Sequence, residues 1–203
     1  MEIKDTYKTI EIPTKEILFK EKNSKFFGFA FPVKNSDEIK FYLEQLKKQH
    51  FGAVHFCYAY QIGTEKIEFR ANDDGEPSNS AGIPIYGQIQ SFGLTNILIV
   101  VVRFFGGTKL GVGGLITVYK TTAQLVLENA SIIEKTIDVQ FTITFDYKNV
   151  NKVMRIIKEK QLEIRSQKME ENCQLIIATR KKNAEQIFGI FNSIFEVLIF
   201  KID

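Results

Sequence analysis

The stretch that decides the fold is Asn96-Ile-Leu-Ile-Val-Val-Val-Arg-Phe-Phe-Gly-Gly-Thr-Lys-Leu-Gly-Val-Gly-Gly-Leu-Ile116. Its first part, Ile97 to Val102, is an unbroken run of apolar, mostly β-branched residues, which predicts a strand buried on both faces. Five glycines follow between residues 106 and 114, and from Leu115 the apolar residues recur at helical spacing. The sequence therefore predicts a central strand, a glycine-rich turn, and a long helix that begins near Leu115 and ends near Ala130.

The glycine-rich turn has two interpretations. It is no P-loop, because no Gly-Lys-Ser/Thr begins the helix, and no dinucleotide fingerprint, because Ile116 stands at the third glycine position. In the functional interpretation, bare N–H groups at the start of the helix bind an anion beside Thr108 and Lys109. In the architectural interpretation, the glycines only allow the helix and the sheet to pack closely.

Residues 71–82, Ala-Asn-Asp-Asp-Gly-Glu-Pro-Ser-Asn-Ser-Ala-Gly, break all periodicity and predict an acidic loop. Asp73, Asp74 or Glu76 could bind a hard cation, or one of them could act as a general base with His55. Asp-Asp-Gly is also ordinary turn chemistry, and a lone histidine on an apolar strand is more often a hydrogen-bonded core residue. We expect Ser78, Asn79 or Ser80 to cap the helix that follows, and Gly93 to end it.

The elements around this centre follow from periodicity. Residues 7–34 predict two strands joined by a polar turn at Lys20–Lys25, and Asn35 or Ser36 then begins a helix. Val54–Ile62 and Lys66–Arg70 predict a further pair of strands. The remainder predicts strands at 139–145, 162–168, 174–179 and 197–202 with helices around 150–157 and 184–195, which is the ferredoxin-like βαββαβ order. We place domains at 1–134 and 135–203.

Composition sets broad limits. The 203 residues are 44% hydrophobic and 25% charged, which is typical of a soluble globular protein, and the net charge of +3 allows nucleic acid as a partner without requiring it. Cys57 and Cys173 lie far apart, so the spacing predicts neither a disulfide framework nor a zinc site. No signal peptide or membrane-length apolar run occurs, so we expect a cytoplasmic location and no membrane partner. No catalytic nucleophile, metal ligand set or cofactor motif is recognisable.

Two blocks carry a family resemblance. Arg70-Ala-Asn-Asp-Asp-Gly-Glu-Pro-Ser-Asn-Ser-Ala-Gly-Ile-Pro84, together with Val101-Val-Arg-Phe-Phe-Gly-Gly-Thr-Lys-Leu-Gly-Val-Gly-Gly-Leu115 and Tyr119, resembles the IMPACT/YigZ family. Lys22-Asn-Ser-Lys-Phe26 and Ala53-Val-His-Phe-Cys-Tyr-Ala-Tyr60 support the resemblance. Lys25 replaces the common arginine, which keeps the charge but not the bidentate fork, and Thr117 replaces an arginine beside the glycine turn.

The resemblance implies an α+β protein. Its first domain would be of the ribosomal-protein-S-five-like type, related to the fourth domain of elongation factor G, and its second ferredoxin-like. It also implies a link to translation, since eukaryotic relatives are regulators acting through protein partners and bacterial members are proposed to bind nucleic acid or ribosomes.

Three functions remain open. The leading hypothesis is a non-enzymatic, translation-associated protein that binds RNA or the ribosome. The second is a small-molecule enzyme acting on a phosphorylated metabolite, which requires Asp73, Asp74 or Glu76 to converge with Lys109 in one pocket. The third is a protein-interaction module whose acidic loop contacts a basic partner. In the leading hypothesis the contact residues are Lys25, Arg103, Gly106, Gly107, Thr108, Lys109, Gly111, Gly113 and Gly114.

Overall fold

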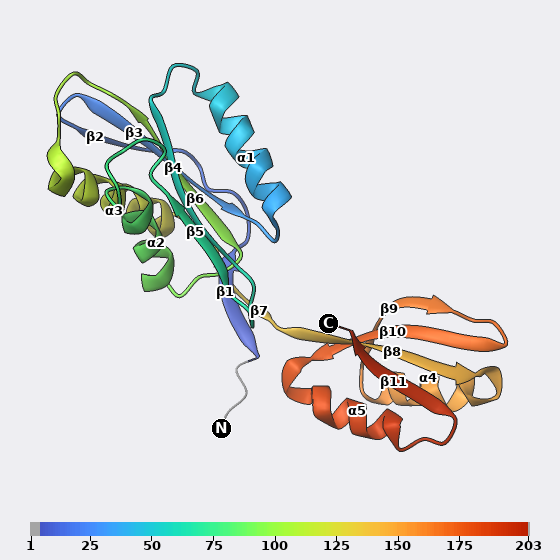
Figure 1. Cartoon of the computed structure of the whole chain (residues 1–203). Coiled ribbons are helices and arrows are strands. Elements are labelled where there is room, and N and C mark those ends of the chain that lie inside the picture. The colour runs from blue at the N-terminus through green and yellow to red at the C-terminus, as the bar shows by residue number, and fades with distance from the viewer. Residues whose placement is uncertain (1–4, 203) are drawn as a thin grey trace. The chain divides into compact units, whose positions relative to one another are not determined.

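The computed structural model describes residues 5–202, and by its internal contacts the chain divides into two compact units (Figure 1). One unit is Tyr7–Lys135, and the other combines Asp5 and Thr6 with residues 136–202. The expected domains, 1–134 and 135–203, remain a prediction about independent folding. The elements of the first unit are β1 (Thr6–Ile10), β2 (Ile17–Glu21), β3 (Ser24–Pro32), α1 (Ser36–Gln49), β4 (His55–Ile62), β5 (Glu68–Asn72), α2 (Gly82–Ser91), β6 (Ile97–Phe104), α3 (Gly111–Glu128) and β7 (Ile132–Thr136).

Strand β6 is the centre of a five-stranded sheet with the order β2-β3-β6-β4-β5. It pairs antiparallel with β3 and β4, and every side chain from Ile97 to Val102 is fully buried. The prediction of a strand covered on both faces is therefore confirmed. An antiparallel strand carries continuous apolar sequence here because helices lie on both faces of the sheet (Figure 1).

Alternation along β6 divides the core into two layers. The hydrophobic cluster packed with α2 and α3 contains Ile97, Ile99 and Val101. The cluster under α1 contains the alternate residues Leu98, Val100 and Val102. Helix α3 approaches β3 closely at Gly28, where a β-carbon would collide with the side chains of Val126 and Thr122. The second half of α3 is thus packed directly against β3.

Two predicted helix starts are wrong. Helix α3 begins at Gly111 rather than near Leu115, so its first turn includes Gly113 and Gly114. At α2 the N-cap residue is Ala81, and none of the predicted serine or asparagine caps serves it. Ser80 instead donates its hydroxyl to the carbonyl of Pro77, which leaves α2 to be capped from elsewhere in the chain.

The second unit contains β8 (Asp138–Asp146), α4 (Val150–Glu159), β9 (Glu163–Lys168), β10 (Asn172–Arg180), α5 (Ala184–Asn192) and β11 (Val197–Ile202). The sheet order is β11-β8-β10-β9, with all neighbours antiparallel, as the βαββαβ pattern requires. The predicted fold class, α+β with a ferredoxin-like C-terminal part, is confirmed. The predicted domain boundary between residues 134 and 135 falls within strand β7, which pairs with β1.

Candidate anion-binding site

The glycine-rich turn joins β6 to α3, and Gly107, Thr108 and Lys109 are exposed. The glycines differ in what the fold requires of them. A β-carbon at Gly106 would collide with the backbone of Asn23, so this glycine permits the close approach of the β2–β3 turn. Gly107 and Gly111 have φ values of +87° and +72°, a left-handed conformation that favours glycine.

Gly113 is needed for neither reason. Its φ is not positive, and a β-carbon built there would meet no atom of the described chain within 4 Å. Glycine in a helix costs about 1 kcal/mol relative to alanine, so the fold alone does not explain this residue. The architectural interpretation therefore explains why Gly106, Gly107 and Gly111 are glycines, but it does not explain Gly113.

The N-terminus of α3 is uncapped. Leu110 is the N-cap residue, and within residues 5–202 no side chain accepts a hydrogen bond from the first turn, which also contains no acidic residue. An 18-residue helix concentrates partial positive charge at such an end. Gly111, Val112 and Gly113 are exposed there, so their N–H groups lie at a surface that an anion can reach.

A buried ion pair lies next to this helix end. Arg103 Nη1 donates to Glu76 Oε1 at 2.6 Å, with side-chain exposures of 6% for Arg103 and 4% for Glu76. Tyr119 donates its hydroxyl to the same carboxylate oxygen at 2.7 Å. Arg103 was expected as an exposed phosphate contact; instead the acidic loop covers it, and its guanidinium lies 5.4 Å from the ring centroid of Phe26 and 5.5 Å from that of Phe105.

His55 lies beside the ion pair in a fixed orientation. Its Nδ1 lies 2.7 Å from the carbonyl oxygen of Asp74, and because a carbonyl only accepts, Nδ1 must carry a proton. Its Nε2 lies 3.9 Å from Glu76 Oε2. The ring is 19% exposed, so Nε2 and the second oxygen of Glu76 form a pair of polar atoms close to solvent.

Cys57 and Tyr119 complete the network beneath the ion pair. The Cys57 thiol donates to the Tyr119 hydroxyl oxygen at 3.3 Å. Burial raises the pKa of Cys57 and also that of Tyr119 far above their ordinary values. Both groups therefore stay protonated at neutral pH, and Cys57 is an unreactive core thiol.

The aspartates of the acidic loop have structural roles. Asp73 Oδ1 accepts hydrogen bonds from the N–H groups of Ala81 and Gly82, at 2.9 and 2.8 Å, and thereby caps α2. Asp74 Oδ2 accepts from the N–H of Phe56 at 2.6 Å. No cluster of three metal-ligating side chains occurs among the described residues. The turn-chemistry interpretation therefore accounts for both aspartates.

The two blocks of sequence meet at a cavity of about 480 Å³, here called the loop pocket. Lys109 and Glu76 both line it, as the small-molecule hypothesis required, and His55 and Arg103 lie with them. The remaining lining residues are Val54, Pro77, Phe105, Leu110, Gly111, Val112 and Leu115. Two cations against one carboxylate give a net charge of +1, or +2 when His55 is protonated.

Sequence reasoning missed the apolar half of this pocket. Val54 was predicted only as the first residue of a strand, and Phe105 was given no role in a site, although both are about half-exposed. The polar half of the pocket could have been found from the pairing of the strands. Arg103 pairs with His55 on β4 and with Phe26 on β3, which places all three side chains on the α2/α3 face of the sheet.

Lys25 is not brought to the loop pocket. It is exposed on β3 opposite Phe104, one residue out of phase with Phe26, and so projects on the α1 face of the sheet. In the second unit, Arg180 pairs with Asp5 at 2.6 Å and Arg155 with Glu159 at 3.6 Å. Acidic side chains therefore partly neutralise these two arginines of the second unit.

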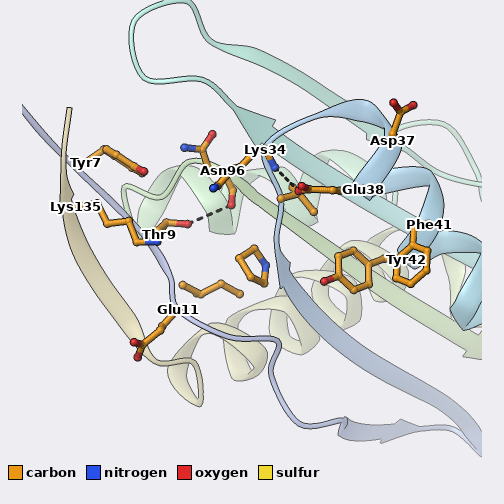
Figure 2. A pocket seen from close by; sticks show the side chains of 13 residues that line it. Tyr7, Thr9, Glu11, Lys34, Asp37, Glu38, Phe41, Tyr42, Asn96 and Lys135 are labelled. Carbon is orange, nitrogen blue, oxygen red and sulfur yellow. Dashed lines mark hydrogen bonds between the residues drawn. The ribbon is translucent and has the colours of Figure 1, made fainter. Parts of the chain in front are cut away.

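A second cavity of about 600 Å³ lies near the start of α1 (Figure 2). Lys34 donates its backbone N–H to Glu38 at 2.7 Å, and Thr9 donates its hydroxyl to the Asn96 carbonyl at 3.2 Å. None of the predicted site residues, all of which lie in the described part of the chain, lines this cavity.

Among the described helices, none is both long and apolar enough to span a bilayer.

Comparison with known proteins identifies relatives of this arrangement. The Impact N-terminal domain matches residues 22–127, which include the acidic loop and the glycine turn. An IMPACT family member from Haemophilus influenzae is 32% identical over 181 residues, covering 86% of this chain and 86% of the relative. IMPACT family member YvyE from Bacillus subtilis is 34% identical over 149 residues, covering 73% of this chain and 69% of YvyE.

A solved structure supports the fold. The crystal structure of a hypothetical protein covers 99% of this chain and 99% of its own, with a TM-score of 0.75 and 22% sequence identity. At this identity the likeness concerns the fold alone. The family assignment rests on two findings: the sequence relatives, and the Impact N-terminal domain match over slightly more than half of the residues. Together they show that this chain belongs to the IMPACT family.

Proposed function

We propose that this protein is a non-enzymatic, cytoplasmic, translation-associated factor that binds RNA, free or on the ribosome, through the start of α3 and Lys109. The link to translation comes from the family, whose eukaryotic members the resemblance associates with translational regulation. The observation that carries the binding role is the exposed, uncapped end of α3, which opens onto a pocket of net positive charge.

Phosphate contacts of this kind give affinity without sequence preference. Gly113 supports the proposal, because a β-carbon there would stand on an exposed helix end that is otherwise open to a phosphate. Thr108 and Lys109 lie beside it on the exposed turn. Arg103 lies on the floor of the pocket rather than at the surface, and Glu76 balances its charge, so Lys109 supplies the uncompensated positive charge.

The test is a binding titration of ribosomes and structured RNA at several salt concentrations. Lys109→Ala should weaken binding to every RNA and reduce the slope of log K against log salt by about 1. Lys47→Ala is the matched control, since it removes the same charge from an exposed residue on α1, which covers the opposite face of the sheet. Absence of binding at low salt, or an unchanged affinity in Lys109→Ala, would overturn the proposal.

Gly113→Ala provides a second test with two readouts. The added methyl group should stabilise the first unit by up to about 1 kcal/mol, because alanine is the better helix former. The same group should weaken RNA binding if a phosphate approaches the N–H groups at this helix end. A variant that is stabilised and binds RNA unchanged would show that the end of α3 is not the contact.

The small-molecule enzyme is a second candidate, favoured by one observation. Glu76 and Lys109 line one pocket, and the Nε2 of His55 faces it as an available base. Release of phosphate from phosphomonoesters by the purified protein, abolished in His55→Asn, would support an enzyme. The protein-interaction module has less support, because Asp73 and Asp74 are already engaged by backbone N–H groups.

A further inference from the structure

We infer that the loop pocket receives one unpaired nucleotide, with its phosphate at Lys109 and the start of α3 and its base against Phe105. This inference rests on the proposed function and specifies the ligand at the same site. The shared chemistry is a nucleoside phosphate, which either belongs to single-stranded RNA or is a free mononucleotide.

The anionic group of the ligand has a defined position. Lys109 and Gly111 line the pocket, so a cationic side chain and the bare N–H groups of a helix end meet at one side of it. Arg103 lines the same cavity, and its Nε is buried without a hydrogen-bond partner among the described residues. The Arg103–Glu76 pair is neutral as a whole, but it leaves Nε of the guanidinium as an unused donor on the pocket floor.

The walls fit an aromatic ring. Val54, Phe105 and Val112 line the pocket and are each about half-exposed, so apolar surface gathers at the rim of a cavity rather than being scattered. The Arg103 guanidinium lies 5.5 Å from the centroid of the Phe105 ring and so helps to hold the ring in place. A ring that is already positioned loses little freedom when a base stacks on it.

The polar end of the pocket offers only acceptors when His55 is neutral. Because Nδ1 carries the proton, Nε2 presents a lone pair, and it lies 3.9 Å from Glu76 Oε2. Two acceptors at this spacing suit a group with two N–H or O–H donors, such as the exocyclic amino group of a base or the two hydroxyls of a ribose. Inorganic phosphate supplies no ring to stack on Phe105.

These three parts together favour a nucleotide over a simple anion. The volume of about 480 Å³ lies in the range typical of small-ligand pockets. A base within a duplex has both faces stacked and its pairing edge occupied, so it cannot enter the pocket. Recognition should therefore require an unpaired nucleotide, at a strand end, in a loop or free in solution.

The experiment uses the full chain labelled with ¹⁵N. Its probes are AMP, UMP, inorganic phosphate, a short single-stranded oligoribonucleotide and the same strand in a duplex. We expect the mononucleotides and the single strand to shift the signals of Leu110, Gly111 and the His55 ring, and the duplex to leave His55 unchanged. Phosphate should bind more weakly and shift only the signals at the start of α3.

Two variants separate the parts of the site. Phe105→Ala should raise the Kd for mononucleotides about five- to 150-fold, the usual range for one lost stacking contact, and leave phosphate binding unchanged. Val112→Glu places a carboxylate in the first turn of α3, where it favours the helix but repels the anion. It should abolish nucleotide binding without lowering the melting temperature, whereas Gln45→Glu on α1, with the same net charge, should bind normally.

The outcomes distinguish the inference from the proposed function. Equal binding of phosphate and mononucleotides, with no effect of Phe105→Ala, overturns the inference and leaves a plain anion site. Equal binding of single strand and duplex, with His55 unshifted, also overturns it while RNA binding stands. Mononucleotide binding without RNA or ribosome binding supports the pocket and identifies a free nucleotide as its ligand. Binding of neither overturns both proposals.

Discussion

Glu76→Gln tests the buried ion pair most directly. The substitution keeps the shape of the side chain but removes the charge that compensates Arg103, whose side chain is only 6% exposed. Removing one partner of a buried pair costs about 3–5 kcal/mol. The glutamine carbonyl can still accept from Arg103 or from Tyr119, so we expect a loss near the lower limit, about 3 kcal/mol.

The measurement must isolate the unit that contains the pair, because two units can unfold in separate transitions. Urea unfolding followed by circular dichroism gives the overall change, and hydrogen exchange of the β6 amides reports the first unit alone. A loss of about 3 kcal/mol corresponds to a drop of about 10 °C in the melting temperature of a unit of this size.

Glu68→Gln is the matched control. Glu68 accepts a hydrogen bond from the Tyr60 hydroxyl at 3.1 Å, as Glu76 does from Tyr119, but its side chain is exposed. Solvent replaces what is lost at an exposed site, so the control should change stability by less than about 1 kcal/mol. Equal effects of Glu68→Gln and Glu76→Gln would refute the reasoning, because the Glu76 pair would then be solvated through the pocket.

The double variant Glu76→Leu with Arg103→Met completes this test. Replacement of a buried ion pair by apolar residues of similar volume is often neutral or stabilising, whereas each single variant leaves one group uncompensated. We therefore expect the double variant to be more stable than either single variant. The net charge of the loop pocket is unchanged in this variant, but its RNA binding should nevertheless be weaker, because the pocket has lost the Arg103 guanidinium as a hydrogen-bond donor.

Three further predictions concern the structural residues of the site. Gly106→Ala should destabilise the first unit severely in urea unfolding, because its β-carbon collides with the rigid backbone of Asn23; wild-type stability would contradict this. Asp73→Ala should cost at least about 1 kcal/mol by removing the cap of α2, and a hydrogen-exchange profile unchanged at the start of α2 would contradict it. Because burial raises the pKa of the Cys57 thiol, the native protein should resist a thiol reagent at Cys57 up to at least pH 9 and react only on unfolding; rapid labelling of the native state would show that this thiol is not buried.

The strand–turn–helix at the centre was predictable because its periodicity changes within one short stretch. The exact start of α3 was not, because glycines carry no apolar period and are poor helix formers. Gly111, Gly113 and Gly114 form the first turn of α3 in spite of this. Packing of Leu115, Val118 and Tyr119 on the sheet fixes the helix, and its first turn follows from there.

The cap of α2 shows a different limit. Sequence rules look for a capping side chain at the N-cap position, where Ala81 stands. The acceptor is Asp73, eight residues earlier, and the turn at Asp74 and Gly75 returns the chain so that its carboxylate reaches the helix. Only the folded loop brings this acceptor to the helix, so no local pattern could have identified it.

Arg103 was predicted as a phosphate contact, yet its side chain is buried. Its burial depends on Glu76, 27 residues earlier in the chain, which reaches it from the acidic loop. The strand register would have placed Arg103 beside His55, but it could not show that the loop folds over both. The sequence thus identified the two blocks that meet but not the ion pair between Arg103 and Glu76.

The position of this ion pair is the strongest physical argument for a ligand site. A buried salt bridge is weak evidence for stability, since apolar residues would often serve the core as well, and the unit already buries apolar residues in two layers. Glu76 and Arg103 lie on the α2/α3 face beside Tyr119 and Phe26, and they also line the loop pocket, with His55 and Lys109 beside them. A pair of charged groups that the core does not need, placed where a ligand can enter beside a lysine that is unpaired within the described chain, is accounted for by a polar, anionic ligand.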